Sequence, residues 1–307
     1  VNIGTGGNTE LAGTIELHGD CLFNVGGTSL TISGLITGDG GLIKNGGSPL
    51  ILTNVNTYTG DTRLNTGVMR LNGNGSITGS SNITLVGGTT LSVTGRVDST
   101  LTLVAGQALK GNGTVNGTLI AGANSTVSPG LDAIGALTVS NAVTLLGTTT
   151  MELNGDSGTN DVLRSDSSIT YGGTLSLTNL GGPLTNGASF KLFRASSYTG
   201  TFSSLAPTTP GPGQAWNTNA LSTTGTISVV GPATIGSITL SGSTLVISGS
   251  NGVPLGTYYM RASTNVTVPL TNWTRIATNT FTPSGNFSFT NIITSAFPMR
   301  FFALEMP

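Results

Sequence analysis

The strongest constraint on the fold is a short unit that recurs along the chain. The unit has a small residue, an apolar residue, Thr or Ser, a second apolar residue and then a turn. It occurs as TSLTISGLITG at 28–38, GTTLSVTG at 88–95, STLTLVAG at 99–106, GALTVSNAVTLLG at 135–147 and GGTLSLTNLGG at 172–182. Apolar residues at every second position indicate β-strands, and many copies of one unit indicate a repeat architecture.

A β-solenoid accounts for both the repetition and the glycine content. Glycine fills 47 of the 307 positions, which is about twice its usual share of roughly 7%. In a solenoid each rung buries its inward side chains against the neighbouring rungs, and glycine at the corners permits tight bends. Turn spacing alone would also fit a sandwich or a barrel, but the repetition favours a solenoid. Because sustained helical spacing is lacking, we expect an all-β chain.

Residues 38–73 are similar to a known bacterial repeat. The segment reads GDGGLIK at 38–44, GGSPLIL at 46–52, NTYTGDT at 56–62 and GVM at 67–69. In this form it resembles the autotransporter-associated β-strand repeat of large bacterial surface proteins. The positions that match are Gly40, Leu42, Lys44, Gly46, Leu50, Leu52, Asn56, Tyr58, Gly60, Thr62 and Gly67, and the departures are Ser48, Pro49, Leu64 and Met69.

The resemblance covers about residues 30–230, because segments such as GQALKGNGTVNGTL and VSPGLDAIGALTV look like the region that commonly follows the repeat. It implies a right-handed parallel β-solenoid (β-helix). Within the repeat we expect Tyr58 and Gly60 to form a corner and a core made of Leu42, Leu50, Leu52, Leu64, Met69 and Leu71.

The composition changes near Pro232. Nine of the 17 aromatic residues fall within the last 76 positions, where short strand-like segments continue. Large aromatic side chains indicate a core of a different kind. We therefore expect a β-solenoid over 1–231 and a small C-terminal antiparallel β-sandwich over 232–307.

Charge and cysteine content exclude several classes of function. Only 7% of the residues are Asp, Glu, Lys or Arg, and the formal net charge is -1, so a nucleic-acid partner is not expected. Cys21 is the only cysteine, which excludes an internal disulfide, and no Cys/His cluster suggests zinc. Neither a cofactor fingerprint nor an apolar run of about 20 residues occurs, so we expect no cofactor and no membrane span. The start at Val1 suggests a processed product.

An enzyme remains one alternative, because parallel β-helices often carry polysaccharide lyases and hydrolases. The densest group of ionisable residues lies in ELNGDSGTNDVLRSD and consists of Glu152, Asp156, Asp161, Arg164 and Asp166. Asp and Asn commonly stabilise tight turns through their side chains, and the resemblance places Asp161 at a recurring structural position. A calcium site in the same loop lacks the tandem GGxGxD repeat. We therefore expect no catalytic residue and no metal.

Other candidate residues have structural explanations. His18 and Cys21 could form a nucleophile pair, but a corner histidine and a core cysteine are favoured. Thr-x-Thr pairs can bind ice on flat solenoids, yet the pairs at 57/59, 148/150 and 278/280 are not in register with one another. Sugar stacking is conceivable for three aromatic residues, although core packing is favoured for each of Tyr198, Trp216 and Trp273.

The ends of the chain suggest the function. Val1 and Ile3 alternate as a strand within VNIGTGG, and no helix or charge cluster covers the first rungs. An uncovered strand edge favours pairing with another chain. We therefore expect a non-catalytic extracellular or cell-surface structural protein that assembles head to tail into a filament or fibre, through an interface that includes Val1, Ile3, Phe301 and Phe302. The alternatives are a monomeric passenger-type adhesin that binds glycans or surfaces, and a polysaccharide-active β-helix enzyme.

Overall fold

The computed structural model describes residues 2–3, 7–293 and 299–306. The chain is 54% strand and 2% helix, which confirms the expected all-β class. It divides into two compact units. The first contains Val1–Pro183, Phe190–Pro207 and Ala220–Ile227, and the second contains Leu184–Ser189, Thr208–Asn219 and Ser228–Pro307. The expected domain boundary between 231 and 232 stays a prediction.

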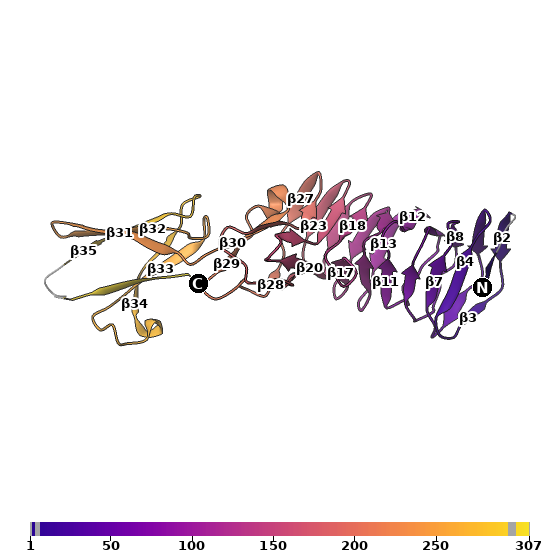
Figure 1. Ribbon diagram of the computed structural model, residues 1–307, viewed down its shortest axis with the longest axis horizontal. Coiled ribbons are helices and arrows are strands. Elements are labelled where there is room, and N and C mark those ends of the chain that lie inside the picture. Colours follow the sequence, from indigo (N-terminus) through magenta and orange to yellow (C-terminus); the bar gives the residue numbers. More distant parts are fainter. Residues whose placement is uncertain (1, 4–6, 294–298, 307) are drawn as a thin grey trace. The chain divides into compact units, whose positions relative to one another are not determined.

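The first unit is a parallel β-solenoid of about 8 turns, whose strands are stacked side by side in Figure 1. One long sheet runs along it, and we call this the first sheet. In order it contains β1 (Asn2–Ile3), β4 (Cys21–Val25), β7 (Leu42–Asn45), β9 (Thr62–Leu64), β11 (Asn82–Leu85), β14 (Ala108–Gly111), β17 (Thr126–Pro129), β20 (Thr148–Asn154), β24 (Thr174–Asn179) and β28 (Ser204–Ala206). A short strand, β21 (Thr159–Asn160), pairs with β20 in the antiparallel sense.

Two further faces complete the coil. The second sheet contains β2 (Asn8–Leu11), β5 (Ser29–Ile32), β8 (Leu50–Leu52), β10 (Val68–Gly73), β12 (Thr90–Arg96), β15 (Thr114–Asn116), β18 (Ala136–Val139), β22 (Val162–Ser165) and β26 (Phe193–Arg194). The third face begins with β3 (Ile15–Leu17) and β6 (Ile36–Gly38). It resumes as a third sheet of β13 (Thr100–Leu103), β16 (Thr118–Ala121), β19 (Val143–Leu145), β23 (Ser168–Tyr171) and β27 (Ser197–Gly200).

The core consists of inward side chains that stack in register from rung to rung. On the second sheet one such column runs through Thr9, Leu30, Leu50, Met69, Leu91, Val115 and Val139. Every member from Leu30 onward has 0% of its surface exposed. The six core residues expected from the sequence, Leu42, Leu50, Leu52, Leu64, Met69 and Leu71, are all at most 1% exposed, so that prediction is confirmed.

Tyr58 and Gly60 form the expected corner. Tyr58 is 1% exposed, and its hydroxyl lies 2.6 Å from the hydroxyl of Thr62. Thr62 in turn donates to Ser80 Oγ at 2.9 Å. A Cβ atom at Gly60 would lie 2.4 Å from the backbone of Gly40, so only glycine allows the two rungs to approach this closely.

A small additional sheet and a short helix are formed by residues between 189 and 230. A sheet of three strands has the order β25 (Ser189–Lys191), β30 (Thr226–Val230) and β29 (Ala215–Asn217). The short helix α1 (Leu221–Thr224) contacts β26 and β27. Neither α1 nor η1 (Leu270–Asn272), the helices in the described ranges, is long and apolar enough to cross a membrane.

The second unit contains two antiparallel sheets with a shared core, as the sequence predicts. One sheet has the order β31 (Thr234–Ser241), β32 (Thr244–Ser250) and β35 (Phe287–Ile292). The other has the order β34 (Thr274–Thr280), β33 (Thr257–Ser263) and β36 (Phe301–Glu305). The core between them is rich in aromatic residues, and its buried members are Leu245, Ile247, Tyr258, Met260, Phe281, Phe287 and Phe289.

The core column predicts a large difference between neighbouring residues of one strand. Leu52 is fully buried, whereas Ile51 points out of the solenoid and is partly exposed. We expect Leu52→Ala to lower the free energy of unfolding by about 2–5 kcal/mol, because it leaves a cavity between rungs. Ile51→Ala should cost less than about 1 kcal/mol. Urea unfolding followed by circular dichroism tests this, and equal losses would contradict the stacked core.

Candidate functional site

The residues predicted to form an assembly interface have different environments. Val1 lies outside the described residues, and Ile3 is opposite Val25 in the pairing of β1 with β4. Phe302 packs against the core of the second unit, with its ring centre 6.4 Å from that of Phe289. Phe301 is the preceding residue of the same strand, so its side chain points to the opposite face. Of the two phenylalanines, Phe301 is therefore the one directed away from the core.

The first rung is incompletely buried. The inward side chains of Thr9, Leu11 and Ile15 are partly exposed. Their partners one rung later are Leu30, Ile32 and Ile36, with exposed fractions of 0%, 1% and 0%. At these three positions the side chains change from partly exposed to fully buried within a single rung, whereas Leu17 of the first rung is already 1% exposed. The described part of the first rung has a neighbour on one side alone.

Some backbone groups in the described part of the first rung point along the solenoid axis, away from the second rung. Leu11 O accepts a hydrogen bond from Ser33 N at 3.0 Å, and Leu17 O accepts one from Gly40 N at 2.9 Å. Successive residues of a strand direct their N–H and C=O groups to opposite sides. The backbone groups of Asn8, Glu10 and Glu16 therefore point away from the second rung, toward the open edge.

The last rungs of the solenoid are covered by their own chain. The Tyr171 hydroxyl donates to Leu221 O in α1 at 3.0 Å, and Phe193 N donates to Gly225 O at 3.0 Å. Aromatic residues pack beneath these bonds, with the ring centres of Tyr171 and Phe193 at 5.0 Å. Within the described residues, these rungs are therefore covered, whereas Thr9, Leu11 and Ile15 of the first rung are partly exposed.

The second unit has an exposed edge strand of its own. All eight residues of β31 are exposed, and within the described residues it pairs with β32 alone. Ile238 is 63% exposed and Leu240 is 62% exposed, although they lie opposite Ile247 and Leu245, which face the core. No charged residue or proline interrupts TIGSITLS. Such residues usually protect edge strands from pairing with other chains.

The acidic group around Asp161 has structural partners. Asp161 is fully buried, and its carboxylate accepts hydrogen bonds of 2.8 Å from Gly135 N and from Glu152 N. The pKa of Asp161 is raised to about 6, mainly by burial and to a smaller extent by the Glu152 carboxylate, while the N–H donors of Glu152 and Gly135 act in the opposite direction. The side chain thus joins backbone segments that are far apart in the sequence.

The remaining members of that group lie in other hydrogen-bond sets. Asp156 accepts from Gly182 N at 2.8 Å in a turn. Arg164 Nε lies 3.1 Å from Asp166 Oδ1 on the outer face of the second sheet. Within the described ranges, no three His, Cys, Asp or Glu residues are grouped to hold a metal ion. The five residues therefore fall into three separate sets of contacts, Asp161 with Glu152, Arg164 with Asp166, and Asp156 with Gly182, rather than one convergent centre.

Lys44 is a buried cation without a solvent-exposed surface. Its Nζ donates to Asn45 O at 2.8 Å, Gly46 O at 2.6 Å and Thr66 O at 3.3 Å. Thr66 belongs to the next rung, so the ammonium group ties two rungs together. Burial lowers the pKa of Lys44 to about 8, at which the group is still largely protonated at neutral pH.

His18 lies between β3 and β4, at a corner as predicted, and Cys21, which was predicted to face the core, begins β4 opposite the buried Leu42. His18 is exposed, and its ring lies 3.3 Å from Asp39 and 3.6 Å from Glu16. Cys21 is partly buried, with Sγ 3.9 Å from His18 O. The thiol therefore contacts a carbonyl group in this arrangement.

The aromatic residues considered for sugar stacking occupy separate places. Tyr198 stacks on Tyr171 at 5.9 Å, and its hydroxyl donates to Phe193 O. Trp216 is buried, and Trp273 Nε1 donates to Val268 O at 2.8 Å. Tyr198 belongs to the first unit, whereas Trp216 and Trp273 belong to the second, so neither unit contains all three side chains.

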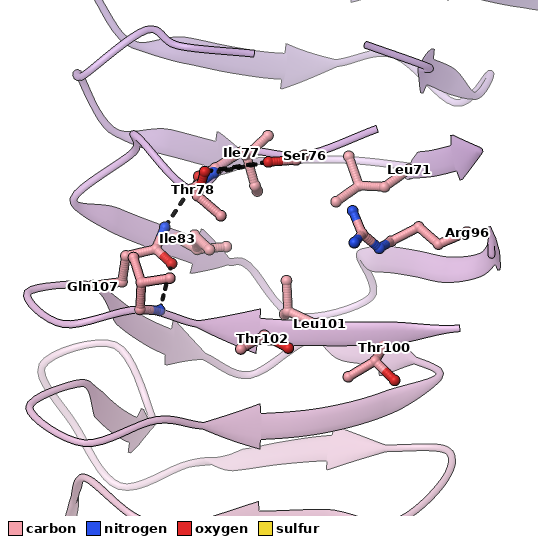
Figure 2. Close-up of a pocket in the computed structure, with 11 residues that line it drawn as sticks. Leu71, Ser76, Ile77, Thr78, Ile83, Arg96, Thr100, Leu101, Thr102 and Gln107 are labelled. Atoms are coloured by element: carbon pink, nitrogen blue, oxygen red, sulfur yellow. Dashed lines mark hydrogen bonds between the residues drawn. The ribbon is translucent and has the colours of Figure 1, made fainter. Parts of the chain in front are cut away.

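A small cavity marks the place where the third sheet starts (Figure 2). Its volume is about 70 Å³, and apolar side chains such as Leu71, Ile83 and Leu101 line it. At the edge of the cavity, Gln107 Nε2 donates to Ile77 O at 3.0 Å and Arg96 donates to Gly75 O. These side chains thus connect backbone segments of neighbouring rungs. Small-molecule sites are usually about 300–1,000 Å³. We therefore interpret this cavity as a gap in the packing where the third sheet begins, rather than as a ligand site.

Polar columns on the outer faces were not predicted from the sequence. On the first sheet Thr126, Thr148, Thr174 and Ser204 are in register, and Thr174 Oγ1 lies 2.8 Å from Ser204 Oγ. On the second sheet Arg164 is in register with Arg194. The turns between these strands vary in length, so the stacked positions have no constant spacing in the sequence.

Comparison with known proteins adds no family assignment. Neither a scan against protein-family models nor a search of curated proteins finds a match to this chain. The resemblance to the autotransporter-associated β-strand repeat therefore stays a prediction.

Because burial lowers the pKa of Lys44, we expect the free energy of unfolding to rise as the pH increases above about 8. The folded-state pKa of about 8 lies below the unfolded value of about 10.4. Between these values the unfolded chain binds more protons, so the free energy of unfolding should rise with pH, by at most about 1.4 kcal/mol per pH unit. Burial raises the pKa of Tyr58, which favours unfolding at still higher pH.

Urea unfolding between pH 8 and 9.5 tests this prediction. Lys44→Met should be less stable than the parent protein, because three carbonyl groups lose their donor, and its stability should lack the rise with pH. A parent protein whose stability is flat or falls over this range would contradict the prediction.

Proposed function

We propose that this protein is a non-catalytic structural protein that assembles head to tail into a filament or fibre. The observation that carries the proposal is the incomplete burial of Thr9, Leu11 and Ile15 beside fully buried partners in the next rung. A covering layer would bury these side chains and pair the open strand edges. Burial of apolar surface contributes roughly 25 cal/mol per Å².

The C-terminal unit of a neighbouring copy is the proposed cover. The solenoid's last rungs carry α1 of their own chain, so direct stacking of one solenoid on another would require α1 to move. The edge strand β31 is exposed, uncharged and partly apolar, which suits strand addition. A contact between two different surfaces that does not close into a ring produces a helical filament.

The proposal also includes a non-catalytic role and an extracellular or cell-surface location. Hydrogen bonds from backbone N–H groups to Asp161, and from Lys44 to carbonyl groups, support structural roles for both side chains. An extracellular or cell-surface location rests on the resemblance to bacterial surface proteins alone. Turnover of a polysaccharide that Asp161→Ala abolishes would favour an enzyme instead.

A lysine in the open layer tests the first half of the interface. In Thr9→Lys the new side chain can reach water in a single copy but would be buried under a covering copy, so we expect assembly to be lost. The matched control is Thr31→Lys, which lies on the outer face of β5 and should assemble normally. Electron microscopy and light scattering of concentrated protein measure the result. Equal assembly of both variants would contradict the proposed layer.

A lysine on β31 tests the second half. Ile238→Lys places a charge on the edge strand and should prevent strand addition without unfolding the protein, because the side chain is already 63% exposed. Ile292→Lys is the control, since Ile292 is 56% exposed on β35. We expect loss of filaments in the first variant alone. Filaments in both would exclude β31 as the covering strand.

A further inference from the structure

Two arginines lie side by side on the outer face of the second sheet. Arg164 in β22 and Arg194 in β26 are direct partners in the parallel pairing of these strands. Both arginine side chains are exposed. The preceding residues, Leu163 and Phe193, point inward and are fully buried, which holds the two strands in place. Adjacent strands are about 4.8 Å apart. Like charges at such positions repel each other and destabilise the pair.

The local sequence does not neutralise this pair. Arg164 Nε donates a hydrogen bond to Asp166 at 3.1 Å, and the other N–H donors of its guanidinium group are available to a ligand. Within the described structure, Arg194 has no hydrogen-bond or ion-pair partner. Between residues 167 and 260 the charged residues are Lys191 and Arg194, so no carboxylate follows Asp166 in this stretch. The pair therefore carries an uncompensated positive charge in a chain of net charge -1.

The arginines line an open hollow of about 260 Å³ together with Ser165, Asp166, Ala195 and Ser196. Ser165 Oγ is engaged with Asn141 O at 2.7 Å, whereas the hydroxyl of Ser196 has no partner in the described part of the chain. Thr138 continues the arginine column on the preceding rung. The hollow thus combines two guanidinium groups with hydroxyl groups and one carboxylate, and its lining is polar rather than apolar.

We propose that this hollow binds the oxyanion group, carboxylate or sulfate, of an acidic oligosaccharide. Arginine matches such groups because its planar fork can donate two parallel hydrogen bonds to them. One anion between the two guanidinium groups relieves their repulsion, and the hydroxyl group of Ser196 offers a partner for a sugar hydroxyl. An acidic peptide would offer fewer hydroxyl groups to this polar lining.

Binding assays with defined oligosaccharides test the site. The probes are a galacturonate hexamer, a sulfated glucose hexamer, the neutral glucose hexamer and a hexaglutamate peptide, each titrated by calorimetry at low salt. We expect one or both acidic sugars to bind, with affinity that falls as salt rises. The acidic sugar that binds identifies the carboxylate or the sulfate as the group recognised. Binding of neither acidic sugar, or equal binding of the neutral sugar or the peptide, would overturn the proposal.

Variants of the hollow give effects in opposite directions. Arg194→Gln should weaken binding at least tenfold, and Arg194→Lys should weaken it less, because lysine keeps the charge but lacks the fork. Asp166→Asn should strengthen binding several-fold, since it removes the carboxylate that competes for Arg164. Arg70→Gln is the matched control, because Arg70 is exposed on the same sheet with Ile51 and Ser92 as partners, and it should change binding less than twofold. Equal losses in Arg194→Gln and Arg70→Gln would also overturn the site.

Discussion

Stacking between rungs is the interaction on which the rest of this structure depends. A side chain such as Leu50 is buried because Leu30 and Met69 lie against it on the neighbouring rungs. In the first described rung, Thr9 has a neighbour on one side and is partly exposed, although Leu17 of the same rung is 1% exposed. Within the described residues, the inward side chains of Thr9, Leu11 and Ile15 are therefore only partly covered. The proposed assembly follows from this property of stacked repeats.

The few ionisable groups in the interior reinforce the same stacking. Lys44 donates to carbonyl groups of two successive rungs, and Asp161 accepts from Gly135 N and Glu152 N. A buried charge is tolerated when hydrogen bonds satisfy it, and its loss leaves several partners unpaired. These side chains therefore stabilise corners and connections. The positive charge of Arg164 and Arg194 differs, because it lies on the outer face, where a ligand can reach it.

The sequence predicted the solenoid and its core because both depend on local alternation. Leu42, Leu50 and Leu52 have inward positions that follow from the two-residue period of a strand, and Gly60 follows from the tight corner. Register between rungs depends on turn lengths that alternation does not encode. The partnership of Arg164 with Arg194 was therefore missed, and so was the column of Thr126, Thr148 and Thr174. The exposed β31 was also missed, because its alternation resembles that of a covered strand.

Site-resolved hydrogen exchange at the open edge tests the central claim most directly. The N–H groups of Asn8, Glu10 and Glu16 point away from the second rung, so they should exchange rapidly in dilute protein. In concentrated protein a covering copy would bond to them, and their exchange should slow markedly. The Leu30 amide, which donates to Pro49 O at 3.0 Å, should stay protected at both concentrations. Exchange at the three edge amides that does not change with protein concentration would contradict the account.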